Sequence, residues 1–217
     1  TIEDGVTNVA WDAHDPILMS EVDSLNTRLP ARIPSFSRID WRLAKAMLWV
    51  ESGGPSRFNN NTKRFESNPS WSGRVLQIGN AGDPAYGVVK DKKDRVSLVV
   101  DEQFNPNVSI ETPGNNIKFG LIYLVQKHVS AKWDSVVDPR DSRRYEITAK
   151  PGDSLDKIAR DVGSTTDLLK RLNPGKDRML RPGDKVQYQK AALRLVATGW
   201  TAVTTATIAE RYNGGGD

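Results

Sequence analysis

Residues 145–189 constrain the fold more than any other part of the chain. They read YEITAKPGDSLDKIARDVGSTTDLLKRLNPGKDRMLRPGDKVQYQ. Extended runs stand at both ends, and two runs with helical apolar spacing lie between them. Ser154 is suited to cap the first helix, Thr165 or Thr166 is suited to cap the second, and the Asn-Pro-Gly run at 173–175 predicts a turn. The order strand, helix, helix, strand predicts a small unit that folds by itself.

The same residues resemble a LysM module, a small glycan-binding βααβ unit. The resemblance rests on Pro-Gly-Asp-Ser-Leu at 151–155 and on Leu-Arg-Pro-Gly-Asp at 180–184. LysM modules bind polymers that contain N-acetylglucosamine, so the resemblance implies glycan contacts from a defined set: Gly152, Asp153, Ser154, Leu155, Asn173 and Pro174. Gly152 also permits a tight turn into the first helix, whose free N–H groups suit acetamido carbonyls and hydroxyls. A spacer or a protein-contact unit is the alternative use of such a module.

Two further helices are predicted by their start and stop signals. Asp40 is suited to cap a helix that ends at Gly53-Gly54-Pro55. Its residues from 43 to 50 are apolar nearly all round, which predicts that its last turns are buried. Thr112-Pro113 opens the other helix, on which Gly120 permits the close approach of a neighbouring element.

Weaker patterns complete the expected organisation. Residues 1–36 predict an irregular extension with one helix near 20–29, packed on the main domain. The runs 87–89 and 96–100 predict a hairpin, and 138–144 read as a linker. The tail after 191 predicts a return to helix, with four residues directed inward: Trp200, Val203, Ile208 and Tyr212.

Four short segments flank the LysM-like unit in an order that resembles the lysozyme-like lytic transglycosylase family, which includes goose-type lysozymes. They are Glu51-Ser52-Gly53, Val75-Leu76-Gln77-Ile78, the helix with Asn116-Ile117, Gly120 and Tyr123-Leu124, and Tyr212-Asn213-Gly214-Gly215. The likeness covers residues 37–130 and 199–216 and departs from the family at Arg74. It implies an α+β fold, in which a mainly α-helical lysozyme-like domain with a small β-hairpin region (37–142 and 190–217) is interrupted by the LysM module (143–189).

This second resemblance implies cleavage of the β-1,4 bond between N-acetylmuramic acid and N-acetylglucosamine, with Glu51 as the general acid. Apolar neighbours and the C-terminal end of a helix are both expected to raise the pKa of Glu51, so that its carboxyl can donate a proton. By resemblance, Gln77 and Tyr212 position the sugar or Glu51, and Ser52 supports the site. Asn213 contacts substrate or orients Glu51, and Tyr123 lines the floor or packs in the core.

The sequence leaves the second half of the reaction open. A hydrolase uses a second carboxylate to activate water or to stabilise the oxocarbenium ion. Asp83 is the first candidate because it follows Gln77 closely, and Glu66 and Asp91 come next. A lytic transglycosylase needs Glu51 alone and leaves a 1,6-anhydro ring on its product.

Composition excludes several other kinds of site. The 217 residues include no cysteine and only two histidines, far apart, so no metal-ligand spacing is present and we expect no cofactor. No apolar run approaches the ~20 residues of a membrane span. A net charge of +4 is compatible with nucleic acid, anionic membranes or anionic wall polymers, although scattered charge usually forms a solvated face, and no nucleic-acid motif of interleaved aromatic and basic residues appears. The expected partner is the peptidoglycan glycan strand, without nucleic acid or membrane insertion.

The chain starts at Thr1 and carries no signal peptide, so we expect a piece of a larger secreted or delivered protein that acts in the periplasm or outside the cell. An antibacterial effector or a phage lysin would fit, and an effector would imply an immunity protein in its producer. Two other functions stay open. One is a wall-binding protein whose lysozyme-like part is inactive, and the other is a protein that binds or cleaves chitin.

Overall fold

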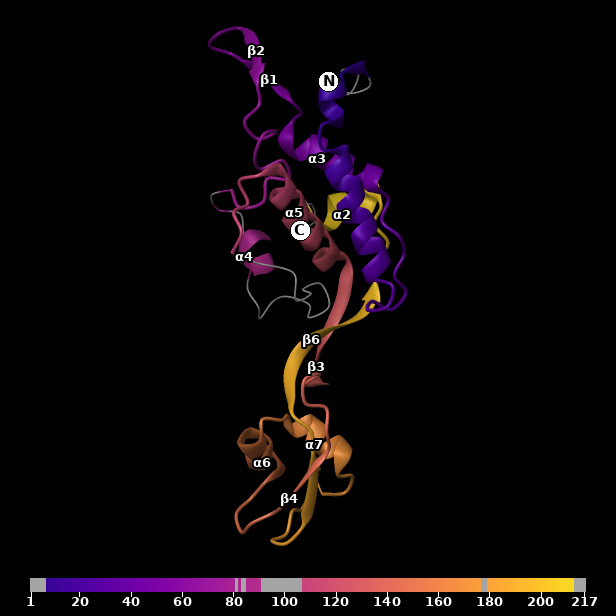
Figure 1. The fold of residues 1–217 in the computed structure, drawn as a ribbon, viewed down its shortest axis with the longest axis vertical. Coiled ribbons are helices and arrows are strands. Elements are labelled where there is room, and N and C mark those ends of the chain that lie inside the picture. Colours follow the sequence, from indigo (N-terminus) through magenta and orange to yellow (C-terminus); the bar gives the residue numbers. More distant parts are fainter. Residues whose placement is uncertain (1–6, 81, 83–84, 91–106, 177–178, 213–217) are drawn as a thin grey trace. The chain divides into compact units, whose positions relative to one another are not determined.

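The computed structural model describes residues 7–80, 82, 85–90, 107–176 and 179–212. The chain divides into two compact units (Figure 1). Unit 1 comprises Thr1–Ala131 and Ala197–Asp217, and unit 2 comprises Lys132–Val196. The predicted module boundaries, 143–189, lie inside unit 2.

Unit 1 is mainly helical. Its elements are η1 (Val9–Asp12), α2 (Asp15–Arg28), α3 (Trp41–Ser52), β1 (Ser56–Asn59), β2 (Arg64–Ser67), α4 (Ala85–Lys90), α5 (Pro113–His128) and α8 (Thr205–Arg211). Strands β3 (Val129–Val137) and β6 (Ala191–Trp200) pair with each other, and each runs from one unit into the other. The fold is therefore a mixture of helix and strand, as an α+β assignment requires.

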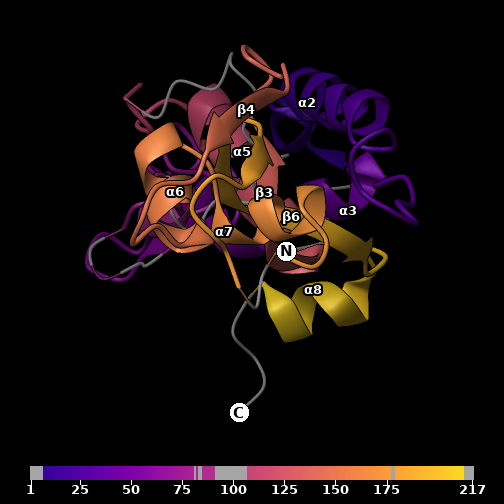
Figure 2. The same ribbon diagram turned by 90° about the horizontal axis from the view of Figure 1, so that it is seen from below.

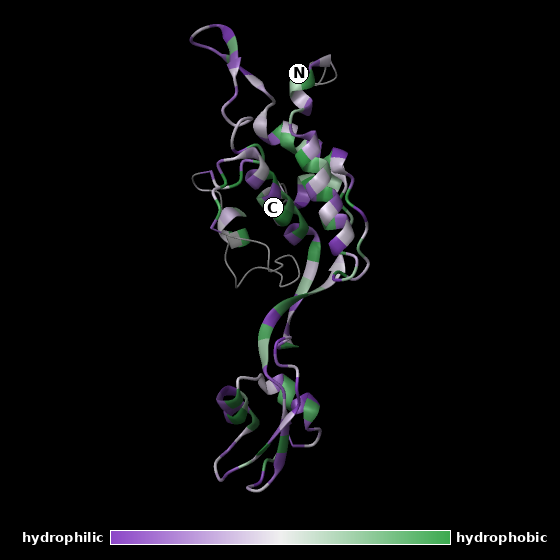
Figure 3. Cartoon of the chain, in the orientation of Figure 1, coloured by the Kyte–Doolittle hydropathy of each residue, from purple (hydrophilic) through white to green (hydrophobic). Residues whose placement is uncertain are grey.

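Helix α5 forms the centre of unit 1. Its buried residues lie on several sides of the helix, including Ile117, Phe119, Leu121 and Leu124, each no more than 1% exposed. The predicted start is confirmed, since the Thr112 hydroxyl accepts a hydrogen bond from the Asn115 N–H. Helices α2, α4 and α8 all contact α5. Figure 3 colours the chain by hydropathy and shows apolar residues along α5.

Gly120 allows a loop to lie directly on α5, as predicted. A Cβ built on Gly120 would overlap the side chain of Leu76, lying 2.9 Å from its Cβ atom. Leu76 is 1% exposed and precedes Gln77. Because nothing larger than hydrogen fits at position 120, the position of the loop depends on this glycine.

Helix α3 begins and ends where the sequence predicts. The Asp40 side chain accepts a hydrogen bond from the Arg42 N–H, and Gly53 closes the helix with a left-handed φ of 74°. The prediction that its last turns are buried is wrong for two residues, Ala46 and Val50, which are exposed. Val50 is 73% exposed, because α3 presents part of its apolar surface to a pocket rather than to the core.

The N-terminal segment packs against α3. Lys45 forms ion pairs with Asp12 at 2.5 Å and with Asp15 at 2.7 Å. The indole rings of Trp11 and Trp49 meet edge to face with their centroids 5.0 Å apart. These contacts fix η1 and the start of α2 on the helix that carries Glu51.

Unit 2 contains β4 (Tyr145–Thr148), α6 (Leu155–Val162), α7 (Thr166–Leu172) and β5 (Lys185–Tyr188). The predicted order is confirmed. The Ser154 and Thr165 side chains cap α6 and α7 by accepting hydrogen bonds from Lys157 N–H and Leu168 N–H. Strands β4 and β5 are antiparallel and enclose a small core with α6 and α7, formed by Ala149, Leu155, Ile158, Ala159, Leu169 and Val186.

A cluster of charges stands at the entry to β4. The Asp141 carboxylate accepts hydrogen bonds from Tyr145 Oη at 2.8 Å, from Arg143 Nε at 3.0 Å and from Lys190 Nζ at 3.0 Å. These partners, Arg143 foremost, hold the pKa of Asp141 far below its usual value. The cluster links the segment before β4 to Lys190, which follows β5.

Two other sequence expectations need correction. Residues 87–89 belong to α4 rather than to a strand, and the partner run 96–100 lies outside the described residues. Residues 191–200 form β6, so the tail returns to helix only at Thr205. Pairing with β3 explains this strand, since helix-compatible residues such as Ala and Leu accept a strand when a partner is present.

Candidate functional site

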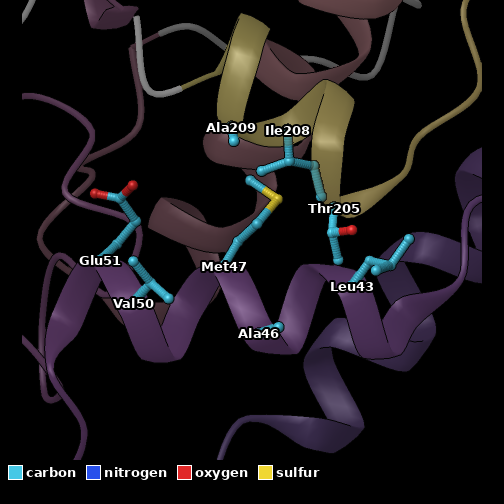
Figure 4. A pocket seen from close by; sticks show the side chains of 8 residues that line it. All are labelled: Leu43, Ala46, Met47, Val50, Glu51, Thr205, Ile208 and Ala209. Carbon is cyan, nitrogen blue, oxygen red and sulfur yellow. The ribbon is translucent and has the colours of Figure 1, made fainter. Parts of the chain in front are cut away.

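Glu51 lies at the rim of a pocket of about 220 Å³ between α3 and α8. The lining residues are Leu43, Ala46, Met47, Val50 and Glu51 from α3, with Thr205, Ile208 and Ala209 from α8. Figure 4 shows Met47 and Ile208 directed toward each other and the Glu51 carboxylate at one end. In Figure 2, α8 lies alongside α3. Glu51 is half-buried, so its carboxylate borders an apolar pocket on one side.

The end of α3 that carries Glu51 is firmly held. The Ser52 hydroxyl donates to the Leu48 carbonyl at 2.7 Å and accepts from the Gly54 N–H at 3.2 Å. Asn68 Nδ2 donates to the carbonyls of Ser52 at 2.5 Å and Gly54 at 2.8 Å. Ser52 is therefore placed to fix the helix end behind Glu51. Both hydrogen bonds of the Ser52 hydroxyl are made to backbone groups, those of Leu48 and Gly54.

Gln77 lies in the loop that packs on α5 at Gly120. Its backbone is left-handed, with φ 56°, and its amide donates to the Arg74 carbonyl at 3.0 Å while accepting from Asn80. Arg74, where the sequence departs from the family pattern, has a structural role here: its guanidinium pairs with Glu111 and donates to the Gly79 carbonyl at 2.8 Å. The Gln77 amide is thus held by its own loop.

Asn116 connects this loop to α5. It is fully buried, accepts a hydrogen bond from the Leu76 N–H at 2.8 Å, and donates to the Ile78 carbonyl at 3.0 Å. A third hydrogen bond goes to the Ile110 carbonyl at 3.3 Å. One side chain therefore satisfies the backbone on both sides of Gln77.

Tyr123 and Tyr212 meet in the structure. Their rings pack edge to face with centroids 5.4 Å apart, and Tyr212 forms the C-cap of α8. Tyr123 is buried at 8% exposure, which fits a floor or core position. The contact joins α5 to the helix that closes the Glu51 pocket.

Three predicted residues lie outside the described part of the chain: Asp83, Asp91 and Asn213. The remaining candidate for a second carboxylate, Glu66, is in β2. Its carboxylate accepts hydrogen bonds from Asn59 Nδ2 at 2.8 Å and Thr62 Oγ1 at 2.7 Å, and these lower its pKa. Glu66 therefore holds the turn of its own hairpin.

The loop before α6 in unit 2 is ordered by its own polar groups. Gly152 takes a left-handed φ of 78°, and Asp153 accepts hydrogen bonds from the Lys150 N–H at 2.8 Å and Lys157 Nζ at 2.9 Å. Gly152 and Ser154 are exposed, whereas Leu155 is 6% exposed and belongs to the core. Of this loop, Gly152 and Ser154 are the residues most accessible to a ligand.

Asn173 is a structural residue in this geometry. Its Nδ2 donates to the Leu169 and Gln187 carbonyls at 2.8 and 2.7 Å, and its Oδ1 accepts from the Gln187 N–H at 2.8 Å. The side chain is 5% exposed and joins α7 to β5. The neighbouring Pro174 is exposed and accessible to a ligand.

The comparisons with known proteins identify one part of the chain. Residues 147–187 match the LysM domain family. LysM domains bind peptidoglycan glycan strands, so the match indicates peptidoglycan or chitin binding and association with the cell wall. No curated protein and no solved structure matches the chain. The lysozyme-like resemblance of unit 1 rests on its four sequence segments.

Two kinds of feature are absent from the described residues, a metal site and a membrane-spanning helix. Among them, no group of three or more His, Asp or Glu side chains is arranged to hold a metal ion. None of the helices in the described ranges is long and apolar enough to cross a membrane.

Sequence reasoning assigned no role to Asn68 or Asn116. Both are buried amides that hydrogen-bond to backbone groups near Glu51 or Gln77. Asn116 belongs to the Asn116-Ile117 segment of the family resemblance, and that segment was the available signal. Asn68 lies in a polar loop, and no feature of the sequence distinguished it from its neighbours.

Proposed function

We propose that unit 1 cleaves the β-1,4 glycosidic bond of peptidoglycan, with Glu51 as general acid, while the LysM domain binds the wall. The observation that carries the proposal is the placement of a half-buried Glu51 at the end of α3, on the rim of the α3–α8 pocket. Activity would then be found at the bacterial wall, in the periplasm or outside the cell.

The local chemistry supports a proton-donating role for Glu51. A general acid must keep its proton until it transfers that proton to the leaving oxygen. Two features support this role: apolar side chains line the pocket beside Glu51, and Glu51 lies in the last turn of α3, at the negative end of the helix dipole. The hydrogen bonds of Ser52 and Asn68 fix the backbone from which Glu51 extends.

The remaining unit 1 residues have supporting roles in this proposal. Tyr212 and Tyr123 hold α8 against α5 and so define the far wall of the pocket. Gln77, presented by a loop that Asn116 and Arg74 secure, positions the sugar. Asn213 directly follows Tyr212 and is assigned to substrate contact by resemblance alone.

Two reaction courses are compatible with a single acid. In a hydrolase, Asp83 would activate water, since Glu66 is engaged in its own hairpin. In a lytic transglycosylase, the 6-hydroxyl of the muramic acid residue attacks and no second carboxylate is needed. The two differ in product mass by one water.

The test is the release of soluble fragments from purified sacculi. The full chain, Glu51→Gln and a matched control, Glu210→Gln on an exposed position of α8, are compared by mass analysis of products. The proposal expects release by the first and third proteins and loss of release in Glu51→Gln. Equal release by all three would exclude Glu51 as the acid.

A second candidate function is supported by the LysM match itself: a protein that binds peptidoglycan or chitin without cleaving it. This function predicts that sacculi retain the protein, and that neither the wild-type chain nor the two variants release fragments. Parallel binding measurements on chitin and on sacculi separate the two polymers. Delivery as an antibacterial effector or phage lysin, and inhibition by an immunity protein, are extensions of the enzymatic proposal.

A further inference from the structure

The β1–β2 hairpin of unit 1 exposes two aromatic rings side by side. Phe58 and Phe65 are directly opposite each other in the antiparallel register, with ring centroids 5.3 Å apart. They are 48% and 73% exposed. Figure 1 shows the hairpin extending beyond the helices of unit 1. A contiguous pair of exposed rings is unfavourable in water and marks a contact surface more than a single exposed residue does.

The two faces of the hairpin differ in chemistry. Because side chains alternate along a strand, the Phe58–Phe65 pair shares its face with the opposed pair Ser56 and Ser67. The other face is polar and carries Arg57, Asn59, Arg64 and Glu66. There the Glu66 carboxylate binds Asn59 and Thr62 and fixes the turn. Glu66 thus stabilises the hairpin from the polar face, while the exposed arginines of that face and the aromatic rings of the other face remain accessible to a ligand.

The base of the hairpin is joined to the end of α3. The Asn68 N–H donates to the Pro55 carbonyl at 3.0 Å, which closes the base of the hairpin. The Asn68 side chain donates to the carbonyls of Ser52 and Gly54. Since a lone two-stranded hairpin is only marginally stable, these bonds attach its base to the end of α3.

The charge of the hairpin is positive. Arg57, Lys63 and Arg64 are exposed, and the only carboxylate between positions 55 and 69 is Glu66. Among the described residues, none of these three cations forms an ion pair within 4 Å with a carboxylate. The hairpin therefore combines an apolar platform, two hydroxyls and a cationic rim.

We propose that the Phe58–Phe65 pair binds the glycan strand on one side of the bond that Glu51 cleaves. This inference rests on the proposed function. The C–H faces of pyranose rings pack on aromatic rings, and the serine hydroxyls on the same face suit sugar hydroxyls. The cationic rim is complementary to the carboxylates of lactyl groups and stem peptides, which peptidoglycan carries and chitin lacks. The hairpin thus makes unit 1 select an anionic glycan.

An anionic lipid surface is the competing occupant, since exposed phenylalanine and basic residues also suit a membrane interface. The direct connection to the Glu51 helix end favours the glycan. Asn68 bonds both the last residue of α3 and the residue before β1, so the hairpin starts from the same backbone that carries Glu51.

Fluorine NMR of the full chain tests the proposal independently of catalysis. The chain contains 5 phenylalanines, and fluorophenylalanine is incorporated into the Glu51→Gln variant. The Phe58 and Phe65 signals are assigned with single Tyr substitutions, and buried Phe119 serves as the internal control. Three probes are added separately: soluble peptidoglycan chains with stem peptides, chitin oligomers of equal length, and anionic phospholipid vesicles.

The proposal expects both hairpin signals to shift with peptidoglycan chains, less with chitin, and not with vesicles, while Phe119 stays unchanged. Absence of a shift at saturating glycan would overturn it, and so would a shift with vesicles alone. Failure of the proposed function is seen separately, as absent cleavage by the wild-type chain, whatever the fluorine signals do.

A kinetic experiment tests the same surface. The double variant Phe58→Ala/Phe65→Ala is expected to need about five- to tenfold more glycan for half-maximal cleavage, at an unchanged maximal rate. Phe58→Tyr/Phe65→Tyr keeps the rings and should restore the wild-type value. Met19 is an exposed residue of α2, and Met19→Ala is therefore the control for loss of an exposed apolar side chain. An unchanged half-maximal concentration in the alanine variant would contradict the proposal.

Discussion

The contact between Gly120 and Leu76 gives the sharpest prediction for unit 1. Gly120→Ala adds one methyl group inside α5. Alanine is worth about 0.5–1 kcal/mol more than glycine in a helix interior, so without other effects the variant would be more stable. The structure places that methyl against Leu76, 2.9 Å from its Cβ, where neither the helix backbone nor the loop can yield cheaply. Overpacking of this kind costs about 1–3 kcal/mol.

The two terms have opposite signs, and the steric term is larger. We therefore expect Gly120→Ala to lower the free energy of unfolding of unit 1 by about 1–2 kcal/mol. With a urea dependence of roughly 1–3 kcal/mol per molar, the midpoint falls by about 0.3–2 M. Tryptophan fluorescence follows this transition, because five of the 6 tryptophans, all except Trp133, belong to unit 1.

Gly114→Ala is the matched control on the same helix. A Cβ there meets only Ile17 Cδ1, at an ordinary 3.9 Å. This variant should equal or exceed the wild type in stability. If Gly120→Ala were as stable as Gly114→Ala, the loop that carries Gln77 would not depend on close approach to α5, and the reasoning would be refuted.

Three further predictions concern polar groups. Asn68→Ala should destabilise unit 1 by about 2–3 kcal/mol in urea unfolding, because it leaves two buried carbonyls unpaired; a change under 0.5 kcal/mol would show that the α3 end is held by other groups. Asn173→Ala should lower the thermal midpoint of unit 2 and weaken glycan binding in parallel; lost binding at unchanged stability would instead mean that Asn173 touches the glycan. The folded-state pKa of Asp141 is lowered, so its stabilisation is complete above the ordinary carboxyl pKa near 4 and is lost as the pH falls below that value. Asp141→Asn should therefore flatten the acid-side pH dependence of unit 2 stability, and an unchanged profile would argue against the cluster.

The parts of the fold that sequence predicted are those governed by local signals. Asp40, Thr112, Ser154 and Thr165 cap helices because short polar side chains reach the first free N–H groups of the helix that follows. The βααβ order of unit 2 follows from the same local rules and from its turn residues. Such signals need no knowledge of distant contacts.

The parts that sequence missed depend on partners far along the chain. Strands β3 and β6 are stable only as a pair, and 191–200 alone contains residues that suit a helix equally well. The β1–β2 hairpin offers only two apolar side chains, and both are exposed. Val50 was expected in the core because hydropathy does not tell a pocket from a packed interior.

For the candidate site, sequence identified Glu51, Gln77 and the two tyrosines as a group, and the structure brings Tyr123 and Tyr212 into contact. It named Asn116 only as part of a resemblance segment and did not name Asn68, and it gave neither amide a role, because their roles consist of hydrogen bonds to distant backbone. Buried amides of this kind are visible only once their partners are placed.

The most direct test of the account is the mass of the fragments that the full chain releases from purified sacculi, with Glu51→Gln and Glu210→Gln alongside. The account predicts muropeptide-sized products from the wild type and from Glu210→Gln, and none from Glu51→Gln. Products lighter by one water than reducing fragments would identify a transglycosylase, and reducing ends would identify a hydrolase. Sacculi that bind the wild-type chain and stay uncleaved would contradict the central claim and leave a LysM-bearing binding protein.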